Sequence, residues 1–232
     1  MKLESITIPT AEVTPSQIAE MLGLMQTHYE GVSDSQFLSD LEAKDWVILL
    51  HDGGHLRGFS TQALFQHEIE DQCVNVLFSG DTIIDKNYWG SLALPIAWGR
   101  LMISLQASNP DTALYWLLTT KGYKTYRFLP VFFRCFFPRT GVVIPQFERA
   151  LIDGLARKKF GCRFDPNTGV LRAERDSQRL REGIARIDEI RLRDPHINFF
   201  QAVNPGHSLG DELVCLARCH EDNLTRYIRR QL

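Results

Sequence analysis

One carboxylate, Asp81, stands inside an otherwise apolar segment, Val76 to Asp85 (VLFSGDTIID). A charge in such a strand is costly to bury unless it is paired or hydrogen-bonded. Asp81 is therefore either a carboxylate that accepts hydrogen bonds from neighbouring backbone or a group available for acid–base chemistry. Because side chains alternate along a strand, Ser79 is predicted to share the face of Asp81, and Asp85 is a second carboxylate at the strand's end.

The turn after this segment has the composition of an anion-binding loop. Tyr88-Trp89-Gly90-Ser91 is followed directly by an apolar run, LALPIAWGRLMISL. The first backbone N–H groups of a helix lack acceptors, so a helix N-terminus attracts phosphates and other anions. Ser91 is the predicted N-cap, and Pro95 fits the first turn. An ordinary strand–turn–helix connection explains the same residues.

Five phenylalanines fall within ten residues, Phe128 to Phe137 (FLPVFFRCFF). Such a cluster most often forms buried core. Exposed, it would be an interaction surface for a membrane or a hydrophobic partner. A third interpretation makes Phe132 and Phe133 the wall of a tunnel for a long aliphatic chain, in which each buried CH₂ is worth about 0.8 kcal/mol.

The composition is that of a globular chain with one core. Of 232 residues, 44% are hydrophobic and 23% are charged, and the net charge of −2 gives no reason to expect nucleic acid as a partner. The five cysteines form no CxxC pair and no metal motif, which favours reduced thiols in a cytoplasmic protein and predicts no metal. Neither a signal peptide nor a transmembrane segment is predicted.

The spacing of apolar residues up to Phe137 predicts strand, helix, helix, strand, strand, strand, helix, strand, helix. A helix between two long strands indicates a parallel pair with a right-handed crossover, beside an antiparallel hairpin. The predicted strands are Ser5–Pro9, Trp46–Leu50, Leu56–Phe65, Gln72–Asp85 and Thr112–Thr119; the predicted helices are Ser16–Tyr29, Ser35–Lys44, one reaching about Ala107, and one from near Tyr123 that Pro130 interrupts.

A different pattern follows Phe137. We expect helices over Pro145–Phe160, Ser177–Arg193 and Glu221–Leu232, a hairpin over Arg163–Ala173, and strands over Ile197–Val203 and Leu213–Ala217. The expected organisation is a core over 1–137, a helical insertion with a small hairpin over 138–195, and closing strands with a terminal helix over 196–232, all in one compact unit.

The element order resembles the GNAT (GCN5-related N-acetyltransferase) superfamily, most strongly from Trp46 to about Tyr126. WVILLHDGGHLRGFS is similar to that fold's second and third strands, with Gly58-Phe59 after the turn, and VLFSGDTIID-KNYWGSLAL is similar to its fourth strand and pyrophosphate loop. The loop departs from the family pattern, because Asn87 and Leu92 occupy its first and sixth positions. The resemblance implies an α/β (mixed α+β) fold with splayed central parallel strands flanked by helices, and a C-terminal helical insertion.

The resemblance also implies a donor site for acyl-CoA, or for the phosphopantetheine of an acyl carrier protein. The donor's pantetheine arm would pair with the backbone of Ile83 and Ile84 like an added strand. Its diphosphate would lie on the loop formed by Tyr88, Trp89, Gly90 and Ser91.

For catalysis, the resemblance implies Asp81 as the base that deprotonates the amine and a tyrosine as the acid for the leaving thiolate. Tyr126 is preferred to Tyr123 by position, although a buried tyrosine is more often a core residue. Ser79, Phe132 and Phe133 would contact the substrates. His207, Asp211 and Glu212 would bind the acceptor amine or supply another base, unless they form a solvated turn.

The predicted function is N-acyl transfer of a medium or long acyl chain to an amine: an amino acid, a small molecule or a peptide side chain. In this it resembles long-chain N-acyl amino acid synthases and maturases that fatty-acylate peptides. The alternative is a non-catalytic GNAT-like binding protein that uses a phenylalanine-rich surface. A hydrolase is disfavoured because Gly-x-Ser-x-Gly is absent.

Overall fold

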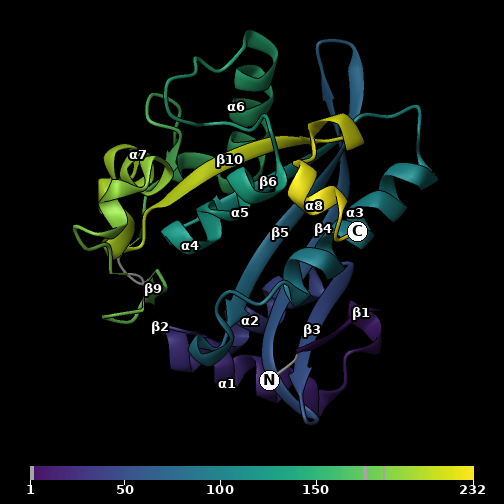
Figure 1. The fold of residues 1–232 in the computed structure, drawn as a ribbon, viewed down its shortest axis with the longest axis vertical. Helices are drawn as coiled ribbons and strands as arrows, with labels where there is room; N and C mark the ends of the chain where they lie inside the picture. The colour runs from purple at the N-terminus through teal and green to yellow at the C-terminus, as the bar shows by residue number, and fades with distance from the viewer. Residues whose placement is uncertain (1–2, 175–176, 185) are drawn as a thin grey trace.

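An eight-stranded mixed sheet organises the chain (Figure 1). The structure, a computed structural model, describes residues 3–174, 177–184 and 186–232. The sheet has the order β1-β3-β4-β5-β6-β10-β8-β7, and β2 pairs with β9 in a separate ribbon. The strands are β1 Glu4–Pro9, β2 Tyr29–Glu30, β3 Trp46–Asp52, β4 His55–Ile69, β5 Gln72–Ile84, β6 Leu114–Thr120, β7 Phe164–Asp165, β8 Val170–Leu171, β9 Arg179–Leu180 and β10 Glu212–Cys219.

Helices cover both faces of the sheet. One face carries α3 and the short helices around it, which share a core with β3, β5, β6 and β10. The other face is covered at one end by α1 and α2 and at the other end by α6, so two separate cores form there. The helices are α1 Pro15–His28, α2 Asp34–Glu42, α3 Ala93–Ser108, α4 Tyr123–Tyr126, α5 Phe128–Phe132, α6 Gln146–Phe160, α7 Pro195–Val203 and α8 Arg226–Arg229.

The central parallel pair is splayed, as the GNAT resemblance implied. β5 and β6 are paired from Asn75 with Leu114 to Ser79 with Leu118. Beyond that point β5 stays with β4 as far as Ile84, while β6 stays with β10 as far as Thr120. The last residues of β5 therefore have no strand partner on the β6 side among the described residues, and an opening begins where the two strands separate.

A bulge in β5 lies at the point of separation. Ser60 pairs with Thr82 and Gln62 pairs with Ser79, so Gly80 and Asp81 together oppose the single residue Thr61. One extra residue in a strand reverses the alternation of side chains beyond it. Ser79 consequently faces the α3 side, where its hydroxyl accepts from Trp116 Nε1 at 2.8 Å and donates to Gln62 at 2.6 Å. The prediction that Ser79 and Asp81 share a face is wrong.

The phenylalanine cluster is core. Phe132 and Phe133 are 1% and 2% exposed and pack edge-on against Trp98, whose ring centroids lie 5.0 and 6.1 Å away. Phe136 and Phe137 are also buried, and only Phe128 of the five is half-exposed. The phenylalanine-rich surface of the alternative function is therefore absent from this segment.

Two predicted elements between residues 177 and 203 are wrong. Ile197–Val203 lies in helix α7 because Asp194 caps it, accepting from the N–H groups of His196 and Ile197, and Pro195 starts it. The described parts of 177–193 contain β9 and a 3₁₀ turn rather than a helix, since pairing with β2 and hydrogen bonds from Arg181 to the α1 end replace helical bonds.

The predicted terminal helix over Glu221–Leu232 is reduced to a 3₁₀ turn and the four-residue α8. At the start of α3 the N-cap is Leu92 rather than Ser91, although Ser91 Oγ does accept from Ala93 N–H at 3.2 Å. The hairpin over Arg163–Ala173 and the strand over Leu213–Ala217 are confirmed as β7–β8 and β10. In the described ranges, no helix has the length and apolarity needed to span a membrane.

Candidate active site

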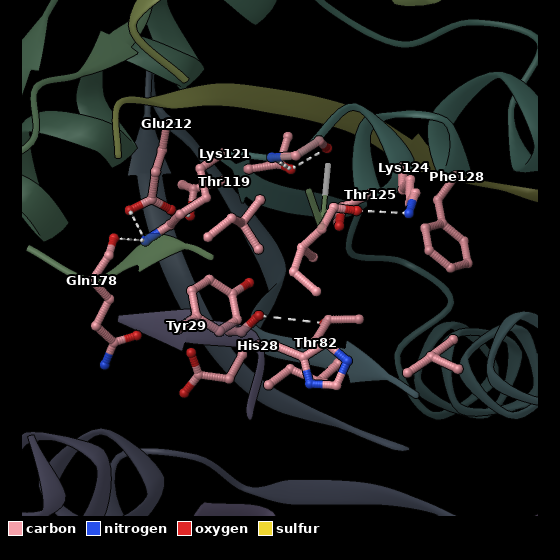
Figure 2. A pocket seen from close by; sticks show the side chains of 18 of the residues that line it. His28, Tyr29, Thr82, Thr119, Lys121, Lys124, Thr125, Phe128, Gln178 and Glu212 are labelled. Carbon is pink, nitrogen blue, oxygen red and sulfur yellow. Dashed lines mark hydrogen bonds and ion pairs between the residues drawn. The ribbon is translucent and has the colours of Figure 1, made fainter. Parts of the chain in front are cut away.

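A cavity of about 1500 Å³ occupies the opening between β5 and β6. Its walls come from the end of α1, the segment through α2, the bulge and end of β5, the loop before α3, the end of β6 with α4 and α5, and the end of α6. Figure 2 shows Tyr29 and Thr82 near its centre, Lys121 and Glu212 on one side, and Lys124 and Phe128 on the other. The cavity therefore reaches both faces of the sheet through the splay.

Asp81 lies on this cavity at the bulge, half-buried. Burial raises the pKa of its carboxyl group from 3.8 to about 6, an effect that Asp40 and Glu212 strengthen and that Lys44 and Lys121 oppose. The absence of a side chain at Gly80 leaves room for the Lys44 side chain, because a Cβ at position 80 would lie 2.7 Å from Lys44 Cε. A carboxylate with this pKa can accept a proton at neutral pH.

Tyr29 and Glu212 face the same space as Asp81. Burial, Asp81 and Glu212 all raise the pKa of the Tyr29 hydroxyl, so it stays protonated. Lys121 Nζ lies 5.6 Å from the Tyr29 ring centroid and 3.6 Å from Glu212 Oε1 (Figure 2). Glu212 also pairs with Arg163 at 3.5 Å and accepts from Thr119 Oγ1 at 3.0 Å. The cavity thus holds a carboxylate with a raised pKa beside a protonated phenol.

The loop before α3 opens on the cavity at the far end of β5. Trp89, Gly90 and Ser91 line the wall, and Trp89 Nε1 donates to the carbonyl oxygen of Ile84 at 2.9 Å. Turns within the loop use the N–H groups of Trp89 and Ser91, so among the described residues the Gly90 and Leu92 N–H groups have no protein acceptor. Lys124 lies over the Trp89 ring. Free N–H groups with a cation nearby suit an anion.

The structure brings eight of the predicted site residues together or close to this cavity. Seven line it, namely Asp81, Ile83, Ile84, Trp89, Gly90, Ser91 and Glu212. Tyr88 belongs to the same loop, but its side chain is buried in the α3 core and its hydroxyl donates to Asp52 at 2.5 Å. Its backbone N–H donates to the carbonyl oxygen of Asp85 and its carbonyl oxygen accepts from the Ser91 N–H, so Tyr88 shapes the loop rather than lining the cavity.

Six other predicted residues lie away from the cavity: Ser79, Tyr126, Phe132, Phe133, His207 and Asp211. Tyr126 is completely buried, and its hydroxyl donates to the carbonyl oxygen of Pro138 at 2.9 Å. A phenol held in this way cannot protonate a thiolate in the cavity.

His207 and Asp211 have structural roles. The His207 ring lies 5.5 Å from the Phe200 ring, and burial lowers the pKa of its imidazole. Asp211 pairs with Arg172 at 2.9 Å and accepts from Ala173 N–H at 2.8 Å, which joins the turn before β10 to the end of β8.

Of the basic and phenolic residues that line the cavity, sequence reasoning named Tyr123 as a second choice for the acid and missed Tyr29, Lys44, Lys121, Lys124, Arg127, Lys159, Arg163 and Tyr227. They lie at the ends of elements far apart along the chain, and no local motif links them. The one available signal is position, because Tyr29 ends the first helix and Lys121 ends the strand after the crossover. In the ranges that the structure describes, no group of histidine, cysteine and acidic side chains could hold a metal ion.

No protein-family model matches the sequence, and no curated protein matches it. Among solved structures, the chain is similar to a protein from Enterococcus faecalis named as a probable N-acyltransferase, with a TM-score of 0.42, 14% identity and coverage of 55% of this chain and 31% of that one. It is also similar to a GNAT family N-acetyltransferase from Escherichia coli in complex with CoA, with a TM-score of 0.39, 16% identity and coverage of 55% and 69%.

A third similar structure is N-myristoyltransferase from Saccharomyces cerevisiae with bound myristoyl-CoA, with a TM-score of 0.39, 11% identity and coverage of 52% and 31%. This chain therefore spans under a third of the first and third structures. At these values the likeness concerns the arrangement of elements and carries no argument about activity. The strand order and the splayed parallel pair of this chain agree with the GNAT-like fold that the sequence resemblance implied.

Proposed function

We propose that the protein is an N-acyltransferase that moves an acyl group from acyl-CoA, or from an acylated carrier protein, to an amine. The observation that carries this proposal is one cavity lined by a carboxylate with a pKa of about 6, by the unpaired strand end that this carboxylate begins, and by a helix N-terminal loop with free N–H groups at the other end of that strand. Acyl transfer to an amine needs a base, a channel for the thioester and a site for the carrier's phosphates. This cavity offers all three.

The donor would enter along β5. On the β6 side, Asp81 to Ile84 have no strand partner among the described residues, so this edge could pair with the amide groups of a pantetheine arm as an added strand would. The Ile84 carbonyl oxygen already accepts from Trp89 Nε1. The loop of Trp89, Gly90 and Ser91 would then receive the diphosphate, with Lys124 supplying positive charge.

In the proposed reaction, Asp81 accepts a proton from the acceptor's ammonium group. The free amine attacks the thioester carbonyl carbon, a C–N bond forms, and the C–S bond breaks as the tetrahedral intermediate collapses. The leaving thiolate takes a proton from Tyr29, and the second proton of the attacking nitrogen returns to the Tyr29 phenolate. Tyr29 replaces Tyr126 in this role because Tyr29 lines the cavity together with Asp81, whereas Tyr126 does not. The products are an amide and a free thiol.

The finer specificity belongs to the same proposal. A medium or long acyl chain finds no tunnel at Phe132 and Phe133; the apolar wall is formed by Phe128 and Val131 on one side and by Phe78 and Phe160 on the other. A cytoplasmic location would suit the five free thiols. The competing function is non-catalytic binding. The phenylalanine-rich segment cannot supply its binding surface because that segment is buried, but a CoA-binding protein without turnover would use the same cavity.

The test combines donor binding with thiol release. Thermal unfolding is followed with CoA, acetyl-CoA, decanoyl-CoA and palmitoyl-CoA; a ligand at about 100 times its dissociation constant stabilises the fold by roughly 2.7 kcal/mol. Thiol release is then followed with acyl-CoA and mixed amines. Binding with release that Asp81→Asn abolishes supports the proposal. Binding without release points to a binding protein, and no binding by any thioester refutes a CoA donor.

A further inference from the structure

Two lysines from distant parts of the chain converge on one ring at the cavity wall. Lys44 lies between α2 and β3, and Lys159 lies near the end of α6. Lys159 Nζ is 4.2 Å from the centroid of the Phe78 ring, and Lys44 Nζ is 5.9 Å from it. All three side chains line the cavity, directly before the bulge that carries Asp81.

Neither ammonium group forms an ion pair with a described carboxylate. In the part of the chain that the structure describes, the ion pairs of the cavity join Lys121 and Arg163 to Glu212, and Arg127 to Asp194, and none involves Lys44 or Lys159. Lys44 donates to the main-chain oxygen of Asp40 at 2.5 Å, which leaves its other protons available. Enclosure and the charge of Lys44 lower the pKa of Lys159, and the Asp40 carboxylate offsets only part of this effect.

The described wall of the cavity carries more positive than negative side chains, although the chain does not. Among the described residues, six lysine and arginine side chains line it against four carboxylates, whereas the full sequence has a net charge of −2. Such an excess of one sign attracts ligands of the other.

The donor's phosphates do not account for this pair of lysines. The loop before α3 lies beyond Ile84, whereas Lys44 and Lys159 lie beside Phe78 and Gly80. The strand from Gly80 to Ile84 advances by roughly 13 Å at about 3.3 Å per residue. The two lysines therefore stand at the opposite end of the exposed strand, next to the proposed base.

We infer that the acceptor is a small amine that also carries an anionic group, and that Lys44 and Lys159 bind this group while its amine faces Asp81. This inference rests on the proposed function and names its substrate class. A carboxylate and a phosphate share the required chemistry, since each accepts charge-assisted hydrogen bonds from two ammonium groups.

The first experiment compares matched acceptors with acetyl-CoA as donor and thiol release as readout. Each amino acid is paired with its amide, and phosphoethanolamine is paired with ethanolamine. We expect the anionic member of at least one pair to react with a kcat/KM about tenfold or more above its neutral partner, and the pair that responds tells carboxylate from phosphate. Neutral partners that react as well, or no reaction with any anionic amine although CoA binds, would overturn the inference. Absence of CoA binding is the separate failure of the proposed function.

The second experiment tests the two lysines with the preferred acceptor. Lys159→Gln and Lys44→Gln should each raise the acceptor's KM by about tenfold and leave the KM for acetyl-CoA unchanged, and Lys159→Arg should restore most of the loss. Lys158→Gln is the matched control, because it removes the same charge from the same helix outside the cavity. If the variants raise the KM for acetyl-CoA instead, or affect the neutral acceptor equally, the two lysines do not bind the anionic group of the acceptor, and the inference is overturned.

Discussion

Replacing Asp81 with asparagine should abolish turnover and stabilise the protein. The structure raises the pKa of Asp81 from 3.8 to about 6, so the folded chain disfavours the carboxylate by about 3 kcal/mol relative to the unfolded chain. Between these two pKa values the folded state binds more protons than the unfolded state, and stability falls as pH rises through that window. At pH 7.5 the neutral amide avoids this cost, which corresponds to a melting temperature higher by roughly 6 °C.

Thermal unfolding of wild type and Asp81→Asn from pH 3.5 to 8 measures this difference. The difference in melting temperature between Asp81→Asn and wild type should be largest above pH 6 and should disappear below about pH 4. In parallel, wild-type kcat/KM should rise with pH up to about 6 and then level off, since only the carboxylate acts as a base. Asp111→Asn, at an exposed position outside the cavity, is the control. An Asp81→Asn variant that is active, or that is less stable than wild type at pH 7.5, would refute the reasoning.

Three further substitutions and one titration test other parts of the site. Tyr29→Phe should lower kcat by about 10²-fold with donor binding intact, and an unchanged kcat would remove the phenol from the mechanism. Gly90→Glu should weaken CoA binding more than Gly90→Ala, because both disturb a residue at φ +94° but only one adds negative charge; equal losses would deny an anion site at the loop. Affinity for CoA should fall above pH 8, where Lys124 loses its proton, and Lys124→Met should remove that dependence. Phe132→Trp should destabilise the fold by about 1–3 kcal/mol without changing the preferred length of the acyl chain. A shorter preferred acyl chain would support the tunnel at Phe132 and Phe133.

Strongly periodic elements could be read from the sequence because their burial is one-sided and local. The hairpin of β3 and β4, the crossover helix α3 and the parallel pair of β5 and β6 all occur where predicted. The apolar run Ile197–Val203 fits the spacing of a strand as well as that of a helix, so its pattern alone predicted the wrong element. The helix forms because Asp194 caps it and Pro195 begins it. The segment around Leu180 has a helical pattern in the sequence but pairs with β2 as a strand. A contact between segments so far apart in the chain cannot be predicted from the local pattern.

Some of the residues chosen from the sequence lie close together. Asp81, Glu212 and the Trp89–Ser91 loop line one cavity, and their functional roles stay predictions. Ser79 was placed on the wrong face because the alternation rule assumes a regular strand, and a bulge leaves no mark in the sequence beyond a glycine at position 80.

By itself the sequence determined the order of elements up to Phe137, the parallel pair with its crossover helix and the carboxylate in the first strand of that pair, because each depends on neighbours within one or two turns or strands. The splay of the pair was implied by the family resemblance. Only the tertiary structure decided which phenol and which lysines join Asp81. Tyr126 lies near in sequence to β6 yet is sealed in the core, whereas Tyr29 and Lys159 reach the cavity from helices on either side of it. Side chains that meet across a splay are positioned by the packing of three separate cores, and no local pattern records that packing.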